Sequence, residues 1–318
     1  MATYALRRAV TSVGLLVLSS VLIFVVLRLI PGDPTVLKLG GSGEEVDPRA
    51  LAALREELGL DRSLPSQYLH WVTGILHGDF GLSYFSQYPV TELITERAPA
   101  TLQLTVVSLI IGLLIAVPPA VIAAIWGSRA LESLLSGFIA LGMATPTFVS
   151  GILLIILFGN RLPTQGYVPF SEDPIESIKT VLLPAITLAI AIAAPLMLIL
   201  RSSLDDVASA PYIRTAQAKG LLKGNVVMRH LLPNATVPAL TMVGVIIGSL
   251  LGGTVIVEYV FARPGLGSLM VDAVNQRDYE VLQALVLLAA AVFILSSFVI
   301  DLLYGVLDPR LRVGTTGA

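Results

Sequence analysis

The sequence predicts an all-α integral membrane protein with six transmembrane helices, and three observations support this. Apolar residues make up 55% of the 318 residues and charged residues only 13%, with a mean hydropathy of +0.84, whereas soluble proteins carry roughly 25% charged residues. Six windows contain no Asp, Glu, Lys or Arg, and each reaches the length of about 18 residues expected of a spanning helix. The charges between these windows are distributed unevenly between the two predicted sides of the membrane.

The six charge-free windows define the expected spans in chain order: residues 9–27, 98–128, 133–160, 180–200, 230–257 and 281–300. The first window follows two arginines, as in a signal peptide, but no small-residue cleavage site precedes Pro31. We therefore expect the first window to be retained as a span. Several windows contain prolines, which in a helix bundle fit either ordinary kinks or gating hinges.

The distribution of charge predicts the orientation of the chain. Short cytoplasmic loops accumulate Lys and Arg. With the N-terminus inside, the inner segments hold mainly Arg and Lys, including Arg7, Arg8 and Arg129, and the outer segments are rich in acids between Glu44 and Asp61. Both termini are therefore expected in the cytoplasm.

Residues 31–99 are the only sizeable polar segment, and we expect them to form a small external helical cap between the first two spans. Asp47 before Pro48 is a typical helix start, which predicts a helix over 47–58. Apolar residues at helical spacing predict a second helix over 64–76. With one modest apolar face, the cap is not expected to fold alone.

A basic segment, residues 211–238, separates the fourth and fifth windows. The pattern predicts a helix over 212–218, a break at Gly220, and a second helix over 223–231 that ends before Pro233. We call this helix–glycine–helix unit, residues 211–231, the knuckle. Its basic residues place it on the cytoplasmic side: Arg214, Lys219, Lys223 and Arg229.

Gly244, Gly248 and Gly252 in the fifth window form a small-residue face that permits close helix packing. This face could pack within the chain or against a second, similar subunit.

The sequence lacks the residues that catalysis in the membrane would need. It contains no cysteine, and the spans hold no nucleophile paired with a base. Two external histidines, His70 and His77, do not complete a metal site. Only Glu258 and Asp301 bring charge near the spans, both close to an interface, so a proton relay is not expected. No nucleotide-binding loop is present, and we expect neither an enzyme nor a cofactor in this chain.

The knuckle resembles the EAA loop of ATP-binding-cassette (ABC) importer permeases, with residues 215–220 (TAQAKG) followed at the family spacing by Leu232 and Pro233. More narrowly, the whole chain is similar to the B-type permease of dipeptide and oligopeptide importers. The chain departs from the family pattern at Thr215, Gln217 and His230. Seven short blocks match in order over nearly the full length: residues 31–34 (PGDP), 58–61 (LGLD), 78–81 (GDFG), 145–148 (TPTF), 212–220 (YIRTAQAKG), 264–267 (PGLG) and 308–310 (DPR).

The resemblance implies the type I ABC importer fold in the bacterial inner membrane. It implies a second, C-type permease that shares the translocation path, two ATP-binding subunits that hold ATP and Mg, and an extracytoplasmic peptide-binding protein. Membrane lipid surrounds the complex and no nucleic acid is involved. The expected divisions are residues 1–30 (first span), 31–99 (cap), 100–306 (permease core with the coupling loop 202–236) and 307–318 (cytoplasmic tail).

By the same resemblance, the knuckle docks in the ATPase and passes its movement to the spans. The cap and residues 259–280 are expected to receive the binding protein, and Glu258 to provide a polar contact in the translocation path near the outer gate. The expected ATPase-coupling residues are Tyr212, Ile213, Arg214, Thr215, Ala216, Gln217, Ala218, Lys219 and Gly220.

Three alternatives remain open at this point. The same machinery could import nickel chelates or glutathione instead of peptides. A protein of another class, an ATP-independent membrane channel or scaffold, would work without partner chains. The knuckle itself could be an ordinary basic loop that is attracted to anionic lipid headgroups.

Overall fold

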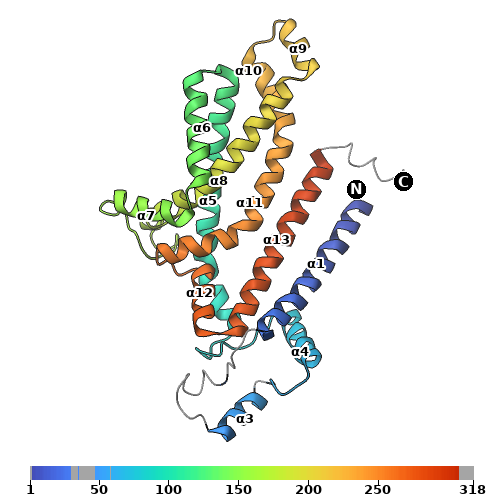
Figure 1. Ribbon diagram of the computed structural model, residues 1–318, viewed down its shortest axis with the longest axis vertical. Helices are drawn as coiled ribbons and strands as arrows, with labels where there is room; N and C mark the ends of the chain where they lie inside the picture. The colour runs from blue at the N-terminus through green and yellow to red at the C-terminus, as the bar shows by residue number, and fades with distance from the viewer. Residues whose placement is uncertain (1, 30–34, 36–46, 58, 308–318) are drawn as a thin grey trace.

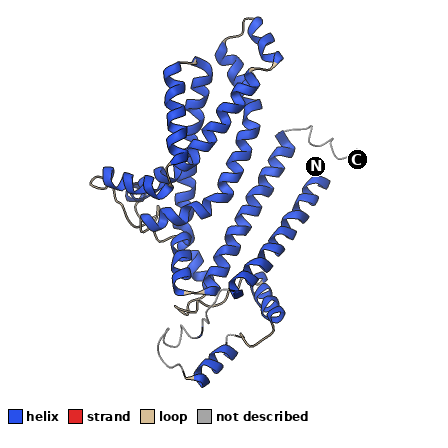
Figure 2. Cartoon of the chain, viewed as in Figure 1, coloured by secondary structure: helices blue, strands red, loops and turns tan. Residues whose placement is uncertain are grey.

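The computed structural model describes residues 2–29, 35, 47–57 and 59–307, and every regular element among them is helical (Figure 2). The predicted blocks at 31–34 and 308–310, and the tail after residue 307, lie outside the described residues. The elements are α1 (Ala2–Leu29), α3 (Pro48–Glu57), α4 (Leu64–Leu76), α5 (Val90–Trp126), α6 (Arg129–Ala144), α7 (Thr147–Phe158), α8 (Pro174–Ala208), α9 (Pro211–Ala218), α10 (Lys223–Val226), the π-helical turn η1 (Val227–Leu231), α11 (Leu232–Val260), α12 (Leu266–Gln276) and α13 (Tyr279–Leu307).

Within the described residues, five stretches of helix are long and apolar enough to span a membrane, and a bent pair can supply the sixth span. The bent pair is α6 and α7, which meet at 109°, so the span expected over 133–160 is broken into two helices at one of the prolines noted in the sequence. The break occurs at Thr145, whose backbone is extended (φ −89°, ψ 119°). Pro146 explains this, because proline disfavours the helical conformation in the residue before it and cannot donate a backbone hydrogen bond.

Prolines elsewhere do not interrupt the helices. Pro118 and Pro119 lie inside α5, and Pro184 and Pro195 lie inside α8. Helix α5 also begins at Val90, so the boundary expected at residue 99 between cap and core falls inside one continuous helix.

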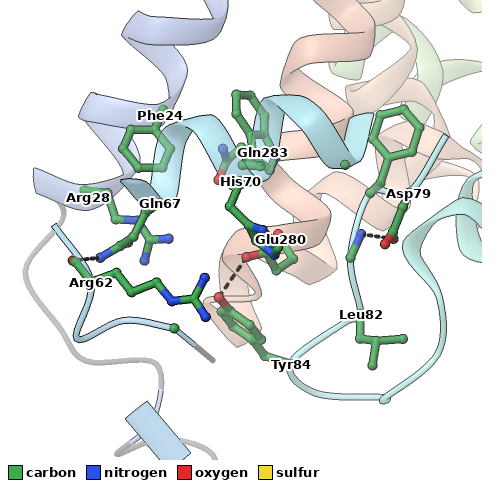
Figure 3. A pocket seen from close by; sticks show the side chains of 15 residues that line it. Phe24, Arg28, Arg62, Gln67, His70, Asp79, Leu82, Tyr84, Glu280 and Gln283 are labelled. Atoms are coloured by element: carbon green, nitrogen blue, oxygen red, sulfur yellow. Dashed lines mark hydrogen bonds between the residues drawn. The ribbon is translucent and has the colours of Figure 1, made fainter. Parts of the chain in front are cut away.

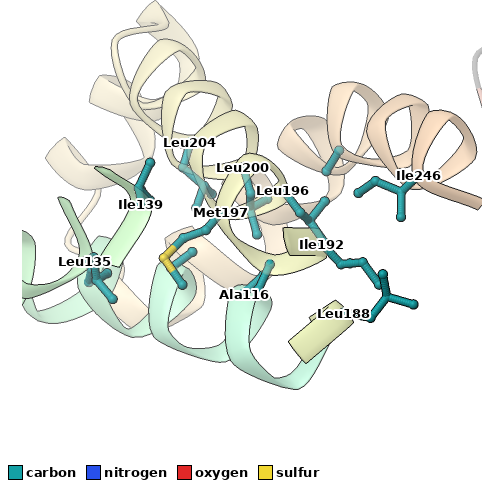
Figure 4. Packing of buried hydrophobic residues seen from close by; sticks show 14 of the residues in the cluster. Ala116, Leu135, Ile139, Leu188, Ile192, Leu196, Met197, Leu200, Leu204 and Ile246 are labelled. Atoms are coloured by element: carbon teal, nitrogen blue, oxygen red, sulfur yellow. The ribbon is translucent and has the colours of Figure 1, made fainter. Parts of the chain in front are cut away.

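Helix α8 forms the centre of the core and is buried along much of its length. Figure 4 shows its apolar side chains packed between those of α5, α6 and α11. Neighbouring helices approach α8 closely at glycines. A Cβ atom at Gly112 would lie 2.7 Å from Ile192, and one at Gly142 would lie 2.8 Å from Ala194.

The glycine face of the fifth window packs within the chain. A Cβ atom at Gly244 would lie 2.5 Å from Ile300, and one at Gly248 would lie 2.5 Å from Phe293. Both neighbours belong to α13, so these two glycines allow α11 and α13 to pack closely. A Cβ atom at Gly252 would meet nothing within 4 Å.

The two ends of the molecule differ as the charges predict. Figure 1 shows α9 and α10 at one end, towards which the first residues of α1 and the last turns of α13 also point; α3, α4 and α12 lie towards the other end. On the first side Arg8 pairs with Asp301 at 3.1 Å. This arrangement agrees with cytoplasmic termini and a cytoplasmic knuckle.

The described part of the cap contacts the spans. Helix α4 has no fully buried residue; it contacts α1 through a 2.9 Å hydrogen bond between Tyr68 and Ser20 and through an aromatic contact with Phe24. Further along, the Ser83 hydroxyl donates to Asp278, just before α13, at 2.5 Å.

Candidate functional site

The knuckle protrudes beyond the bundle at the end of the molecule that the charges predict to be cytoplasmic (Figure 1). Helix α9 begins at Pro211, where a missing backbone N–H costs nothing, since first-turn N–H groups have no partner within the helix. The helix has only eight residues, and an isolated helix of that length is unstable in water. Contacts with the rest of the chain must therefore hold it.

Ile213 provides the main contact of this kind. Its side chain is fully buried (0% exposed) and belongs to the main core. Val226, Val227 and Leu231 from the other half of the knuckle belong to the same core, and the half-buried Ala216 packs against it. Ile213 therefore ties α9 to the helix that leads into α11.

Gly220 makes the turn between the two halves. Its φ is +78°, in the left-handed region that glycine adopts most readily. The Leu221 amide donates to the Ala216 carbonyl at 3.4 Å, the long hydrogen bond of a Schellman helix end. A Cβ atom here would meet nothing within 4 Å, so backbone conformation rather than space calls for glycine.

The outer surface of the knuckle is both apolar and basic. Tyr212 is 49% exposed and Leu222 is 75% exposed, and Arg214, Lys219 and Arg229 are exposed beside them. Exposed apolar side chains among cations are typical of a surface that docks a protein partner. A loop attracted only to lipid headgroups would need the cations alone.

The second half of the knuckle differs from its prediction. It does not end before Pro233; α10 continues through η1 into α11, which contains Pro233 in its first turn. Within η1 the Leu232 amide donates to the Val227 carbonyl, five residues earlier. This wider turn gives the proline ring room and removes the usual clash with the carbonyl four residues before it.

Glu258 lies near the end of α11, in a buried cluster. We predicted a polar contact in the translocation path, but the side chain is fully buried (0% exposed) and offers no surface to a solute. Its carboxylate accepts from the Thr101 hydroxyl at 2.6 Å and from the Ser268 amide at 3.0 Å. It thereby joins α5 and α11 to the first turn of α12, where a negative charge is favourable.

Arg263 completes this buried cluster, and its side chain is also fully buried. It donates to the Ala100 carbonyl at 3.3 Å and to the side chain of Gln103. Burial lowers the pKa of Arg263 to about 10, so the guanidinium stays charged at neutral pH. Neither Thr101 nor Arg263 was predicted from the sequence. The local signal of a closely packed site was the glycine pair of the 264–267 block, because a Cβ atom at Gly265 or Gly267 would collide with Glu258.

Comparisons with known proteins agree over the whole length. A family model described as "Binding-protein-dependent transport system inner membrane component" matches residues 108–313, and a model for the N-terminal part of such components matches residues 1–105. The chain is 36% identical over 315 residues to the probable peptide ABC transporter permease protein y4tP of Sinorhizobium fredii, covering 98% of this chain and 100% of that one. It is 40% identical over 315 residues to the glutathione transport system permease protein GsiC of Salmonella typhimurium, covering 98% and 99%.

Two solved structures share the fold. One is an inward-facing MetNI methionine ABC transporter, with a TM-score of 0.54 and 16% identity over 68% of this chain and 96% of that one. The other is an amino acid ABC transporter with histidines, with a TM-score of 0.52 and 18% identity over 67% and 93%. At these identities the likeness concerns the fold alone, and it confirms the predicted importer architecture.

Proposed function

This chain belongs to the family of binding-protein-dependent transport system inner membrane components, and on that premise we propose that it imports small peptides, with glutathione among the cargo. It is a permease subunit of an ABC importer, it lies in the inner membrane, and ATP hydrolysis resides in a separate subunit. The cargo proposal is supported by two full-length relatives whose names give peptide and glutathione transport.

The proposed assembly contains a second permease, two ATP-binding subunits that hold ATP and Mg, and an extracytoplasmic binding protein that docks on the outer side. Within it, residues Tyr212–Gly220 dock on an ATPase and pass its closure to α8 and α11. Residues 1–30, 31–99, 100–306 (with the coupling loop 202–236) and 307–318 remain our proposed first span, cap, core and tail.

One observation carries the coupling proposal: Ile213 is fully buried while its neighbour Tyr212 is half exposed. A helix anchored on one face and open on the other can receive a push from a partner and transmit it to the core. The names of the two relatives described above support neither nickel chelates as cargo nor an ATP-independent channel.

Co-purification tests the assembly. The chain is expressed with its genomic neighbours, and ATPase activity is measured with binding protein and a peptide mixture. We expect the ATP-binding subunits and a second permease to co-purify, with hydrolysis stimulated by loaded binding protein. A chain that purifies alone and leaks solute without ATP would contradict the proposal.

Matched surface variants test the docking role. Leu222→Asp places a charge on the exposed knuckle, where the side chain is 75% exposed, and should reduce the amount of co-purified ATPase. Leu76→Asp makes the same change at a site that is 78% exposed on the external α4 and should leave the ATPase bound. Equal ATPase recovery in the two variants would refute docking at the knuckle.

A further inference from the structure

A cavity of about 350 Å³ lies at the outer end of the molecule, at the cap (Figure 3). Phe24 and Arg28 from α1 line one wall, and Trp71 from α4 another. The remaining walls come from the segment between α3 and α4, which carries Arg62, from the loop before α5 and from the first turns of α13. This cavity lies at the end opposite the knuckle, and the coupling mechanism does not use it.

The cavity is lined by buried polar atoms that have no hydrogen-bond partner among the described residues: two donors and one acceptor, Gln67 Oε1. Gln283 is only 3% exposed, and its Nε2 has no acceptor among the described residues. The indole Nε1 of Trp71 is buried without an acceptor as well. A buried donor left without a partner costs roughly 1–3 kcal/mol, so an acceptor supplied from outside would be bound favourably.

Two cationic side chains, Arg28 and Arg62, also line the cavity. Neither Arg28 nor Arg62 pairs with a carboxylate within the described part of the chain. Arg28 lies over the ring of Phe24 at 5.3 Å, which holds its guanidinium at the cavity wall. Guanidinium groups bind carboxylates through paired hydrogen bonds.

The same cavity also holds carboxylates of its own. One oxygen of Glu280 accepts from the Tyr84 hydroxyl at 2.9 Å, and one oxygen of Asp79 accepts from the Gly81 amide at 2.9 Å. The second oxygen of each carboxylate makes no hydrogen bond to a described residue. In the view of Figure 3, Arg28 and Arg62 lie on one side of the cavity, Asp79 on the other, and Glu280 between them.

We propose that this cavity binds a small zwitterionic solute, with the solute's carboxylate held by Arg28, Arg62 and the Gln283 amide and its ammonium group facing Glu280 and Asp79. The volume lies at the lower end of the roughly 300–1,000 Å³ of small-molecule sites, which suits a short peptide better than a long one. That the solute is the transported peptide rests on the function proposed above. The cavity would then be a subsite for short peptides on the permease itself.

Trp71 makes binding measurable. The chain has two tryptophans; the other, Trp126, ends α5 and is 71% exposed. The Trp126→Phe variant leaves Trp71 as the remaining tryptophan of the chain. With this variant of the full chain in phosphatidylcholine nanodiscs, a change in Trp71 fluorescence measures binding in the cavity. The probes are alanyl-alanine, its C-terminal amide and inorganic phosphate. We expect a saturable change with alanyl-alanine and little response to the other two.

Two variants and a control assign the response to the proposed contacts. Arg62→Gln and Gln283→Leu should each weaken alanyl-alanine binding by about tenfold or more, as expected for one lost charge-assisted or buried hydrogen bond. Arg49→Gln, at an exposed arginine of α3 outside the cavity, should leave binding unchanged. Arg62 is itself exposed, so its replacement does not threaten folding.

Three results would each overturn the proposal: no saturable response to alanyl-alanine, an equal response to the amide or to phosphate, or unaltered binding in both variants. Uptake by the assembled complex separates this proposal from the proposed function. Peptide uptake without a Trp71 response leaves the function standing and removes the subsite. A Trp71 response without uptake of any peptide would support the binding site and contradict peptides as the transported cargo.

Discussion

The anchoring of α9 by Ile213 leads to a prediction about coupling. Replacing Ile213 with Ala removes about three buried carbon atoms, worth about 0.8 kcal/mol each, or about 2.4 kcal/mol before any cavity term. That loss shifts the equilibrium between docked and undocked α9 by roughly fiftyfold. The long helices of the core keep their contacts, so we expect the chain to fold and insert but to transmit ATPase closure poorly.

Hydrogen exchange of the α9 amides and peptide uptake by the reconstituted complex measure this directly. In Ile213→Ala we expect α9 to lose protection while α5 and α8 keep theirs, and ATP hydrolysis to proceed with little uptake. Ile213→Val should cost only about 0.5–1.5 kcal/mol and retain most of the uptake. Normal α9 protection together with normal uptake in the alanine variant would refute the anchoring argument.

Three further predictions concern the packing of the spans. Gly248→Leu should destabilise the chain by about 1–3 kcal/mol through overpacking of α11 against α13, seen as a lower thermal midpoint in detergent, whereas Gly252→Ala, with open space around it, should not. Glu258→Gln should lower the stability of the fold by about 1–3 kcal/mol, because the new side-chain NH₂ group would face the Thr101 hydroxyl or the Ser268 amide, which both donate hydrogen bonds to the carboxylate. The preference of uptake among differently charged peptides should remain unchanged. Arg8→Gln should cost no more than about 1 kcal/mol, since its partner Asp301 is partly exposed.

Each of these predictions has a clear contrary result. Equal thermal midpoints for the two glycine variants would contradict close packing at Gly248. A changed charge preference in Glu258→Gln would return that residue to the translocation path. A large loss of stability in Arg8→Gln would show that the ion pair is more shielded than its exposure implies.

The sequence predicts the spans well because the absence of charge is a property of each window alone. The same local reasoning does not predict that the helix breaks at Pro146 but continues through Pro118. Both lie in apolar windows, yet the chain breaks at the first and continues through the second. Whether a helix tolerates proline depends on the neighbours that satisfy its freed carbonyl groups, and those neighbours come from distant parts of the chain.

The burial of Glu258 was not foreseen for a related reason. Its position at the end of a span was foreseeable, but its burial depends on Thr101, 157 positions away in the sequence. The knuckle was easier to predict, since its turn depends on Gly220 itself and on hydrogen bonds to residues a few positions away. Pro233 was misjudged there because a π-helical turn has no strong local signature.

The pairing of α1 with α13 has a consequence for the order in which this protein is made. Helix α1 leaves the ribosome before the other described helices, but α13, which it packs against, is the last of these helices to be synthesised. At roughly 5–20 residues per second, the roughly 250 residues between them take on the order of 12–50 s. During that time the side of α1 that later contacts α13 faces lipid or an insertion factor. The Arg8–Asp301 ion pair forms only after α13 has entered the membrane.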